Sequence, residues 1–165
     1  PEPFLMLNLP IPPHSVKRSP TLYDCIDLYT ETESLTDWKN TETGEEQEVT
    51  RSIKFFTLPE VLVIDLKRFN NQMRKDQRII EFPIENLDLS DYVIGYHADT
   101  YVYDLYGICN HSGSTYGGHY TAFVKNANDN WYHYNDRSVT EIVSPSRIIT
   151  SKAYCLFYRK KNSST

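Results

Sequence analysis

The chain has 165 residues, of which 39% are hydrophobic and 13% aromatic, and these values predict one compact domain with a substantial core. Its formal net charge of -5 argues against a nucleic-acid or anionic-membrane partner, which clustered Lys and Arg would bind, and favours a basic protein or peptide. An odd number of cysteines without a CxxC pair, and no apolar run of ~20 residues, predict an intracellular protein, cytoplasmic or nuclear, without a membrane span.

Three segments are predicted in the N-terminal third. Alternating apolar residues predict a strand at residues 4–9, which prolines end. Thr21 stands three residues before Asp24 in a capping-box arrangement, so a short helix is predicted over residues 22–29. Residues 31–48 carry seven acidic side chains against one lysine, which indicates a solvated, turn-rich excursion.

The β signal dominates the middle of the chain. Residues 49–56 predict a strand, and the near-continuous apolar run at residues 61–66 predicts a strand that is buried on both faces. A polar loop follows at residues 70–78, and Pro83 excludes a helix interior or a central strand at its position.

The last third predicts several strands in close succession. They lie at residues 100–112, 119–126, 130–136, 138–142 and 153–161. Their short connections contain turn-forming Asn, Asp, Gly and Ser, so antiparallel hairpins are expected. Residues 144–149 predict a single helical turn before the last strand.

Two of the six glycines, Gly117 and Gly118, directly precede His119. Glycine is needed where φ is positive or where another backbone comes too close for a Cβ, and this pair suits either need. Asn135 and Asp136 close the next predicted strand, where a hairpin partner returns beside His119. An amide or carboxylate there is expected to bond one imidazole nitrogen and to leave the other free as a base. The structural alternative is a loop that simply closes into a strand.

A metal site is a second explanation for the histidines. His111, His119 and His133 with Asp136 match no zinc-ligand spacing, and no HxxxH or CxxC element is present. No metal is therefore expected at these residues.

Six blocks of the sequence stand out together, namely "PEPFLMLNLPIP", "TLYDCIDLYTETESL", "LPEVLVIDLKRF", "YDLYGICNHSGSTYGGHYTAFVKN", "WYHYNDRSV" and "AYCLFYRK". In this order they resemble the C-terminal part of a ubiquitin-specific protease catalytic domain. The resemblance covers nearly the whole chain. It implies an α+β, papain-like cysteine protease fold, with residues 1–165 forming a mostly antiparallel β palm and part of the fingers, with few short helices.

The resemblance also implies roles for individual residues. His119 matches the family's general base, Asn135 the third triad position, and Asp136 the acidic neighbour that assists it. The implied reaction is thiol-dependent hydrolysis of the bond after the C-terminal glycine of ubiquitin, so the implied partners are ubiquitin and ubiquitinated proteins.

The narrow channel for the ubiquitin tail is implied in the same way. Its wall is assigned to Phe69, Gly117, Gly118 and Tyr120. The loops at residues 70–78 and 110–117 match segments that gate this channel. The paired glycines would then let an extended Gly-Gly terminus pass beside the imidazole.

The sequence departs from the family at the nucleophile. The Gly-Asn-Thr-Cys block and the oxyanion-hole Asn upstream of it are not among these residues. Cys25, Cys109 and Cys155 match structural positions and are expected to be buried small hydrophobes, with Cys25 facing the core. This chain alone is therefore expected to be inactive and to need the missing N-terminal, nucleophile-bearing part of the catalytic domain.

The finger zinc site departs as well. Asn40 and Thr43 stand where relatives carry the CxxC cysteines, and amide and hydroxyl groups do not replace thiolates at a structural zinc. No metal or other cofactor is therefore expected.

Three hypotheses for the function follow. The first is the part of a cysteine deubiquitinase that supplies His119 and the Asn135–Asp136 pair. The alternative is a catalytically inactive ubiquitin-binding module, and the third is a structural β-rich protein with a chance Gly-Gly-His sequence.

Overall fold

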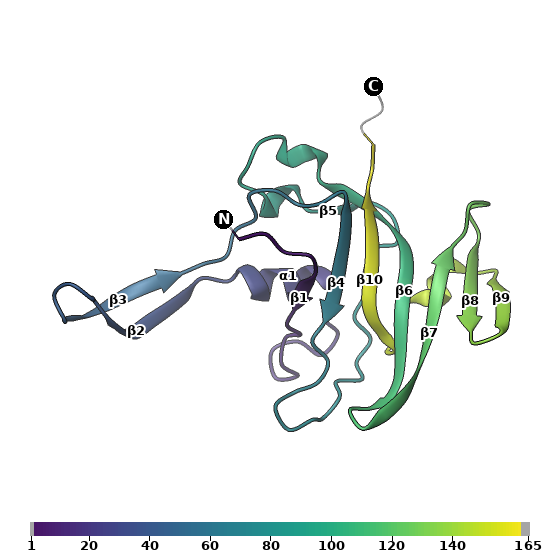
Figure 1. Ribbon diagram of the computed structural model, residues 1–165, viewed down its shortest axis with the longest axis horizontal. Coiled ribbons are helices and arrows are strands. Elements are labelled where there is room, and N and C mark those ends of the chain that lie inside the picture. The colour runs from purple at the N-terminus through teal and green to yellow at the C-terminus, as the bar shows by residue number, and fades with distance from the viewer. Residues whose placement is uncertain (1, 163–165) are drawn as a thin grey trace.

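The computed structural model describes residues 2–162, which form one large sheet, a separate hairpin and a single α-helix (Figure 1). Within this range the eight-stranded sheet has the order β1-β4-β10-β6-β7-β8-β9, with β5 paired to β6 beside that path. Its strands are β1 (Leu7–Leu9), β4 (Val61–Leu66), β5 (Leu87–Asp88), β6 (Val102–Ser114), β7 (Gly117–Lys125), β8 (Trp131–Asn135), β9 (Ser138–Ile142) and β10 (Ala153–Lys160). β1 and β4 are parallel, and the remaining pairs are antiparallel.

The predicted succession of antiparallel hairpins in the last third is confirmed. β6 pairs with β7, β7 with β8 and β8 with β9, and β10 returns between β4 and β6. The predicted helical turn is a 3-10 helix at Pro145–Ile148, and two further 3-10 helices lie at Ser90–Tyr92 and Ala98–Thr100. None of the helices in residues 2–162 has the length and hydropathy needed to cross a bilayer.

The predicted capped helix is also present, as α1 (Leu22–Thr30). The Thr21 hydroxyl accepts from the Asp24 amide, and the Asp24 carboxylate accepts from the Thr21 amide, which is the reciprocal capping box. Leu22, Cys25 and Ile26 are buried in the core, so the predicted position of Cys25 is confirmed.

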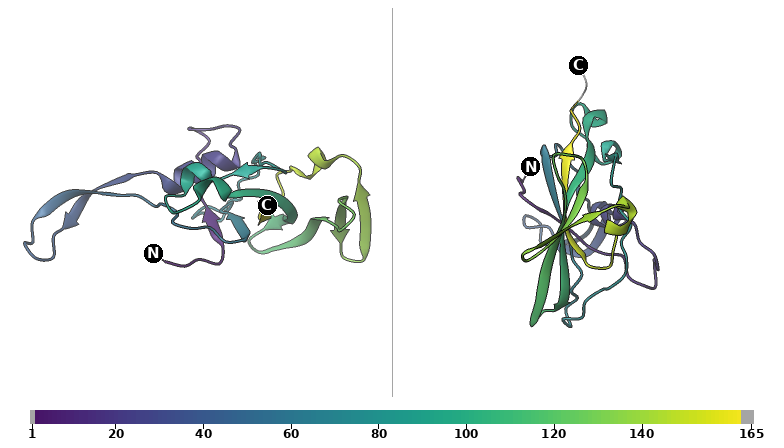
Figure 2. Two further views of the ribbon diagram at one scale, coloured as in Figure 1. Left: turned by 90° about the horizontal axis from the view of Figure 1, so that it is seen from above. Right: turned by 90° about the vertical axis from the view of Figure 1, so that its right-hand side faces the viewer.

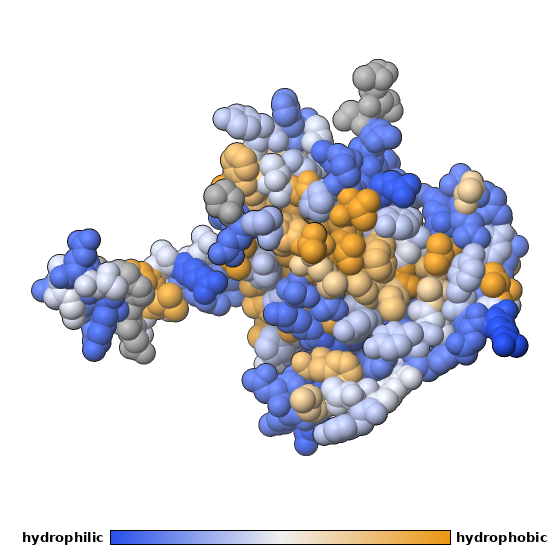
Figure 3. Space-filling view, in the orientation of Figure 1, coloured by the Kyte–Doolittle hydropathy of each residue, from blue (hydrophilic) through white to orange (hydrophobic). Residues whose placement is uncertain are grey.

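The prediction that residues 61–66 are buried on both faces was wrong. Leu62, Ile64 and Leu66 are fully buried, whereas Val61 is 42% exposed and Val63 and Asp65 are half-buried. The reason is that α1 lies on one side of the sheet (Figure 2), where Leu22, Cys25 and Ile26 pack in one core cluster with Leu62, Ile64 and Leu66. We call the other face the open face, and Figure 3 shows hydrophobic residues gathered near its middle, over β4, β10 and β6.

The acidic excursion forms a two-stranded hairpin, β2 (Glu33–Lys39) and β3 (Glu46–Arg51), which projects away from the sheet (Figures 1 and 2). The strand predicted at residues 49–56 is therefore displaced and ends at Arg51. Its remaining residues lead back to the sheet, and Phe55 forms an isolated bridge with Val93.

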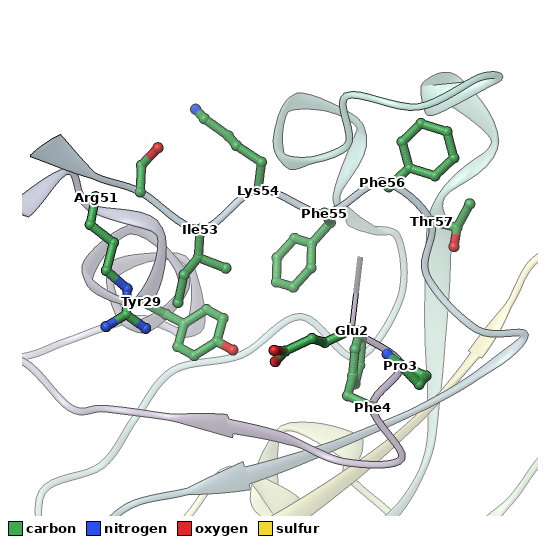
Figure 4. A pocket seen from close by; sticks show the side chains of 11 residues that line it. Glu2, Pro3, Phe4, Tyr29, Arg51, Ile53, Lys54, Phe55, Phe56 and Thr57 are labelled. Atoms are coloured by element: carbon green, nitrogen blue, oxygen red, sulfur yellow. The ribbon is translucent and has the colours of Figure 1, made fainter. Parts of the chain in front are cut away.

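A cavity of about 720 Å³ lies at the base of this hairpin, at the opposite end of the sheet from β7, β8 and β9 (Figures 1 and 4). The ring of Phe55 lies 6.1 Å from those of both Phe4 and Tyr29. This hollow is lined by Glu2, Pro3, Phe4, Tyr29, Arg51, Ser52, Ile53, Lys54, Phe55, Phe56 and Thr57. It contains none of the residues that the sequence predicts as a site.

Candidate functional site

The structure brings together the side chains of His119 and Asn135. His119 lies near the start of β7 and Asn135 is the last residue of β8. The two strands are antiparallel with Ala122 opposite Tyr134, so Asn135 ends β8 beside the first residues of β7. Asn135 Oδ1 lies 2.6 Å from His119 Nε2. An amide oxygen only accepts, so this contact assigns the ring proton to Nε2 and leaves Nδ1 as the basic nitrogen. Within residues 2–162, His119 Nδ1 has no hydrogen-bond partner, and the ring is half-exposed.

Asp136 lies just beyond this contact. Its Oδ2 is 3.9 Å from His119 Nε2, which is too long for a hydrogen bond but short enough for an ion pair with a protonated ring. Asp136 has a φ of 50° in the turn between β8 and β9, and its side chain is largely exposed. Of the two predicted neighbours, Asn135 therefore makes the direct contact with the imidazole.

The two glycines before His119 differ in their surroundings. Neither has a positive φ. A Cβ on Gly118 would lie 2.3 Å from His111 Nε2 and 2.5 Å from the Ser112 backbone oxygen, whereas a Cβ on Gly117 would meet nothing within 4 Å. Gly118 is therefore required by packing inside the chain itself, and only Gly117 is free of such a requirement.

The prediction of a loop at residues 110–117 was wrong. β6 continues to Ser114 and β7 starts at Gly117, so only a short turn separates them. Cross-strand pairing explains the difference, because Gly113, with a φ of 122°, lies directly opposite Gly118. A Cβ on Gly113 would lie 2.5 Å from the Gly117 backbone oxygen and 2.6 Å from Gly118 Cα, so the absence of side chains lets the two strands stay paired up to the turn.

His111, which the sequence suggested only as a rejected metal ligand, is the centre of an aromatic cluster. The residue is 5% exposed, and its ring centroid lies 4.8 Å from that of Tyr120 and 6.0 Å from those of Phe69 and Tyr154. Two of the predicted channel residues, Phe69 and Tyr120, thus share one neighbour. The sequence does indicate which face of the sheet His111 occupies. It follows Cys109 by two residues in an alternating strand, so both side chains lie on the same face.

Lys75 connects the predicted gating loop at residues 70–78 to this cluster. Its Nζ donates to the His111 carbonyl at 2.6 Å and lies 3.1 Å from His111 Nδ1. Because an ammonium only donates, the ring must be neutral with its proton on Nε2. Burial, and secondarily the charge of Lys75, lower the pKa of His111.

The same loop is fixed at its other end by Arg68, which is 1% exposed. Arg68 Nε donates to the Ala153 carbonyl at 2.6 Å, and Nη1 donates to the carbonyls of Arg78 at 2.8 Å and Asp76 at 3.0 Å. The loop, β10 and the end of β4 are thereby joined. A cavity of about 530 Å³ remains between this loop and the β6–β7 hairpin, lined by Lys75, Gln77, His111, Ser112, Gly113, Ser114, Gly117, Ser151 and Lys152.

None of the three thiols has the environment of an activated nucleophile. Burial raises the pKa of Cys25 and Cys155 to about 12, and it raises that of Cys109 as well. No hydrogen bond joins any of them to His119 within residues 2–162.

The tip of the β2–β3 hairpin is closed by the side chain of Asn40. Asn40 Oδ1 accepts from the amides of Glu42 at 2.9 Å and Thr43 at 3.4 Å, and the Asn40 amide donates to the Glu45 carbonyl. The part of the chain that the structure describes contains no group of three or more His, Cys, Asp or Glu arranged to hold a metal.

Comparison with known proteins gives consistent matches. The family model described as ubiquitin carboxyl-terminal hydrolase matches residues 16–158. Ubiquitin carboxyl-terminal hydrolase 12 of Saccharomyces cerevisiae is 42% identical over 88% of this chain, and ubiquitin carboxyl-terminal hydrolase 4 of Pongo abelii is 37% identical over 92%. The chain spans only 12% and 16% of the length of these two relatives.

Solved structures of the SAGA Ubp8/Sgf11/Sus1/Sgf73 DUB module share the fold. One superposes with a TM-score of 0.81 at 32% identity, and covers 98% of this chain and 36% of its match. Another, bound to monoubiquitin, gives a TM-score of 0.80 at 31% identity, and covers 99% of this chain and 36% of its match. These similarities confirm the predicted α+β, papain-like class.

Proposed function

The chain belongs to the ubiquitin carboxyl-terminal hydrolase family, and on that premise we propose that it supplies the His119 base and the orienting Asn135 of a cysteine-type deubiquitinase. The observation that carries this proposal is the 2.6 Å contact between Asn135 Oδ1 and His119 Nε2. It fixes the tautomer that a general base needs and leaves Nδ1 available.

The proposed reaction is acyl transfer through a thiol. His119 Nδ1 takes the proton of a cysteine on the nucleophile-bearing part of the catalytic domain, and the thiolate attacks the carbonyl of the C-terminal glycine of ubiquitin. The imidazolium then returns its proton to the leaving lysine amine, and water hydrolyses the acyl-enzyme. Asn135 holds the ring by a neutral hydrogen bond, and Asp136 at 3.9 Å adds a favourable charge while the ring is protonated.

We further propose that the large sheet is the palm and that the β2–β3 hairpin is part of the fingers. Gly117 is the glycine that leaves room for the ubiquitin tail, since a Cβ there meets nothing within 4 Å. Ubiquitin is the proposed partner, and the related DUB module bound to monoubiquitin supports this choice. The engagement of Asn40 in its own turn supports a hairpin that forms without zinc. The proposed location is intracellular.

A catalytically inactive ubiquitin-binding module is the second candidate. The observation that favours it is that burial raises the pKa of Cys25, Cys109 and Cys155, so none of them serves as the nucleophile. Under either candidate we expect this chain alone to be inactive.

Complementation separates the two candidates. The chain is mixed with the separately purified upstream segment of a relative that carries the Gly-Asn-Thr-Cys block, and cleavage of a fluorogenic ubiquitin substrate is followed. If no activity appears while ubiquitin still binds in a calorimetric titration, the binding module replaces the enzyme as the conclusion.

If activity appears, His119→Ala is expected to lower kcat by about 10²- to 10⁴-fold with little change in the Kd for ubiquitin. Asn135→Ala is expected to lower it less, because Asp136 lies close enough to contact the ring. His133→Ala is the matched control, since this histidine lies on β8 against Phe123 and not at the proposed base. Equal activity of wild type and His119→Ala would remove His119 from the mechanism.

A further inference from the structure

Two of the three cysteines face each other across neighbouring strands. Cys109 of β6 and Cys155 of β10 are direct register partners in an antiparallel pair, so their side chains share one face of the sheet. Directly opposed residues have Cα atoms about 4.5–5.5 Å apart. A disulfide requires a Cα separation of about 4.4–6.8 Å, so the pairing already places both residues within reach of a bond.

The shared face is the open face of the sheet. Ala122 of β7 and Asp65 of β4 continue the same register row on either side of the pair, and neither belongs to the covered core. Cys109 is half-buried, and Cys155 is 9% exposed. An apolar hollow of about 340 Å³ opens over Cys109, lined by Tyr106, Gly107, Ile108, Cys109, Ala122, Val124 and Phe157. A small reagent therefore has a route to the Cys109 thiol.

We propose that Cys109 and Cys155 are a redox-active thiol pair, which a small-molecule disulfide such as oxidised glutathione converts reversibly to a cross-strand disulfide. This modification site is independent of the proposed ubiquitin hydrolysis. Cys25 takes no part, because it lies in the covered core on α1.

The exchange proceeds in two thiol–disulfide steps. The Cys109 thiolate attacks one sulfur of oxidised glutathione, which forms a mixed disulfide and releases one glutathione thiolate. The Cys155 thiolate then attacks the Cys109 sulfur, closes the protein disulfide and releases the second glutathione thiolate. The two protons lost by the cysteines end on the two released glutathiones, and the two electrons have reduced the glutathione disulfide.

The surroundings of the pair explain why Cys109 reacts first and slowly. Burial alone raises the pKa of Cys109, whereas burial, then the Asp65 carboxylate, then Cys109 itself raise that of Cys155 to about 12. Two further titratable side chains lie nearby: Tyr154 of β10 is close to both thiols, and Tyr106 lines the hollow over Cys109. Both cysteines are mainly protonated at neutral pH, so an alkaline buffer is needed to observe the exchange on a practical timescale.

The loop closed by this disulfide contains β7, β8 and β9, and with them His119 and Asn135. A bond between residues directly opposed on adjacent strands must also draw their Cβ atoms to about 3.8 Å, closer than the usual spacing of such pairs. A bond strained in this way is more easily reduced than an ordinary structural disulfide, which favours reversibility.

The test exposes the reduced chain to oxidised glutathione at about pH 8.5, where more of each thiol is ionised. The products are trapped with an alkylating reagent and identified by intact mass and peptide mapping. We expect the loss of two hydrogen atoms, one cross-linked peptide joining Cys109 to Cys155, and full reversal by dithiothreitol. Cys25→Ser is the matched control and should give the same product, whereas Cys109→Ser and Cys155→Ser should each abolish it.

Three results would overturn the proposal. They are a wild-type chain that keeps all its thiols, one that carries a stable glutathione adduct on Cys109 without closing the bond, and a cross-link that involves Cys25. The wild-type peptide map decides between these outcomes even if a serine variant fails to fold, and circular dichroism of each variant shows whether it has folded.

Discussion

Replacing Gly118 with alanine tests the packing between β6 and β7 at the candidate site. The added Cβ would lie 2.3 Å from His111 Nε2 and 2.5 Å from the Ser112 backbone oxygen, against ordinary contacts of 3.4–4 Å. The His111 ring is enclosed by Tyr120 and its other aromatic neighbours, and the Ser112 oxygen belongs to a paired strand. Neither obstruction can rotate away, so β6 and β7 must separate locally.

Two opposing contributions set the size of the effect. Alanine restricts the unfolded chain and thereby stabilises the fold by about 0.4–1 kcal/mol. Overpacking that shifts a backbone costs about 1–3 kcal/mol, and two contacts shorter than 3 Å place Gly118→Ala in the upper half of that range. We therefore expect a net loss of about 2 kcal/mol, which for a chain of this length lowers Tm by about 4–8 °C.

The assay is thermal and urea unfolding followed by circular dichroism, with Gly117→Ala as the matched control. Because a Cβ on Gly117 meets nothing within 4 Å, this control keeps only the stabilising effect on the unfolded chain. It is expected to raise Tm by about 1–4 °C while lowering kcat/KM in the complemented enzyme. A Gly118→Ala variant that unfolds at the wild-type temperature, or two variants that lose equal stability, would refute the packing argument.

Three further predictions concern residues outside the proposed reaction. The pKa of His111 is lower in the folded chain than in the unfolded chain, so the unfolded chain binds the proton more tightly and the free energy of unfolding should fall as pH drops below about 6.5. His111→Gln should weaken this pH dependence when the free energy is measured by urea unfolding. An equally steep pH dependence in the variant would contradict the prediction. Arg68→Met leaves the buried carbonyl of Ala153 and the partly buried carbonyls of Asp76 and Arg78 without their donor, and should lower the free energy of unfolding by about 3 kcal/mol. A urea midpoint equal to that of wild type would show that these three bonds are dispensable. Asn40→Ala removes the oxygen that accepts from the Glu42 amide at the tip of the β2–β3 hairpin. It should speed hydrogen exchange of the Glu42 amide about tenfold without changing the global Tm. An unaltered exchange rate would mean that the tip closes without Asn40.

The features that the sequence predicted well are those that neighbouring residues determine. The capping box of Thr21 and Asp24 involves atoms three residues apart, and it forms as expected. The hairpins of β6 to β9 follow from alternation and turn residues within short segments. The contact between His119 and Asn135 belongs to the same class, because it follows from one hairpin register.

The features that the sequence missed depend on partners far away along the chain. Val63 is half-buried because α1 covers only the other face of the sheet, and the apolar sequence of the strand does not predict which face is covered. The role of Gly118 depends on His111 of the opposite strand. The pKa of His111 in turn is lowered by burial and by the charge of Lys75, which reaches it from a loop 36 positions earlier in the chain. The catalytic roles of His119, Asn135 and Asp136 remain predictions that the complementation experiment tests.

The projecting hairpin has a consequence for self-association. β2 and β3 pair only with each other among residues 2–162, so each leaves one strand edge with unpaired backbone groups. Such edges invite pairing with a second molecule. Glu46 is paired with Lys39 at 3.6 Å, whereas Glu33 and Glu48 have no ion pair among the described residues, so two copies approaching edge to edge would bring like charges together. Repulsion between the hairpins of two molecules therefore opposes edge-to-edge pairing at neutral pH, and it leaves both strand edges free for another partner.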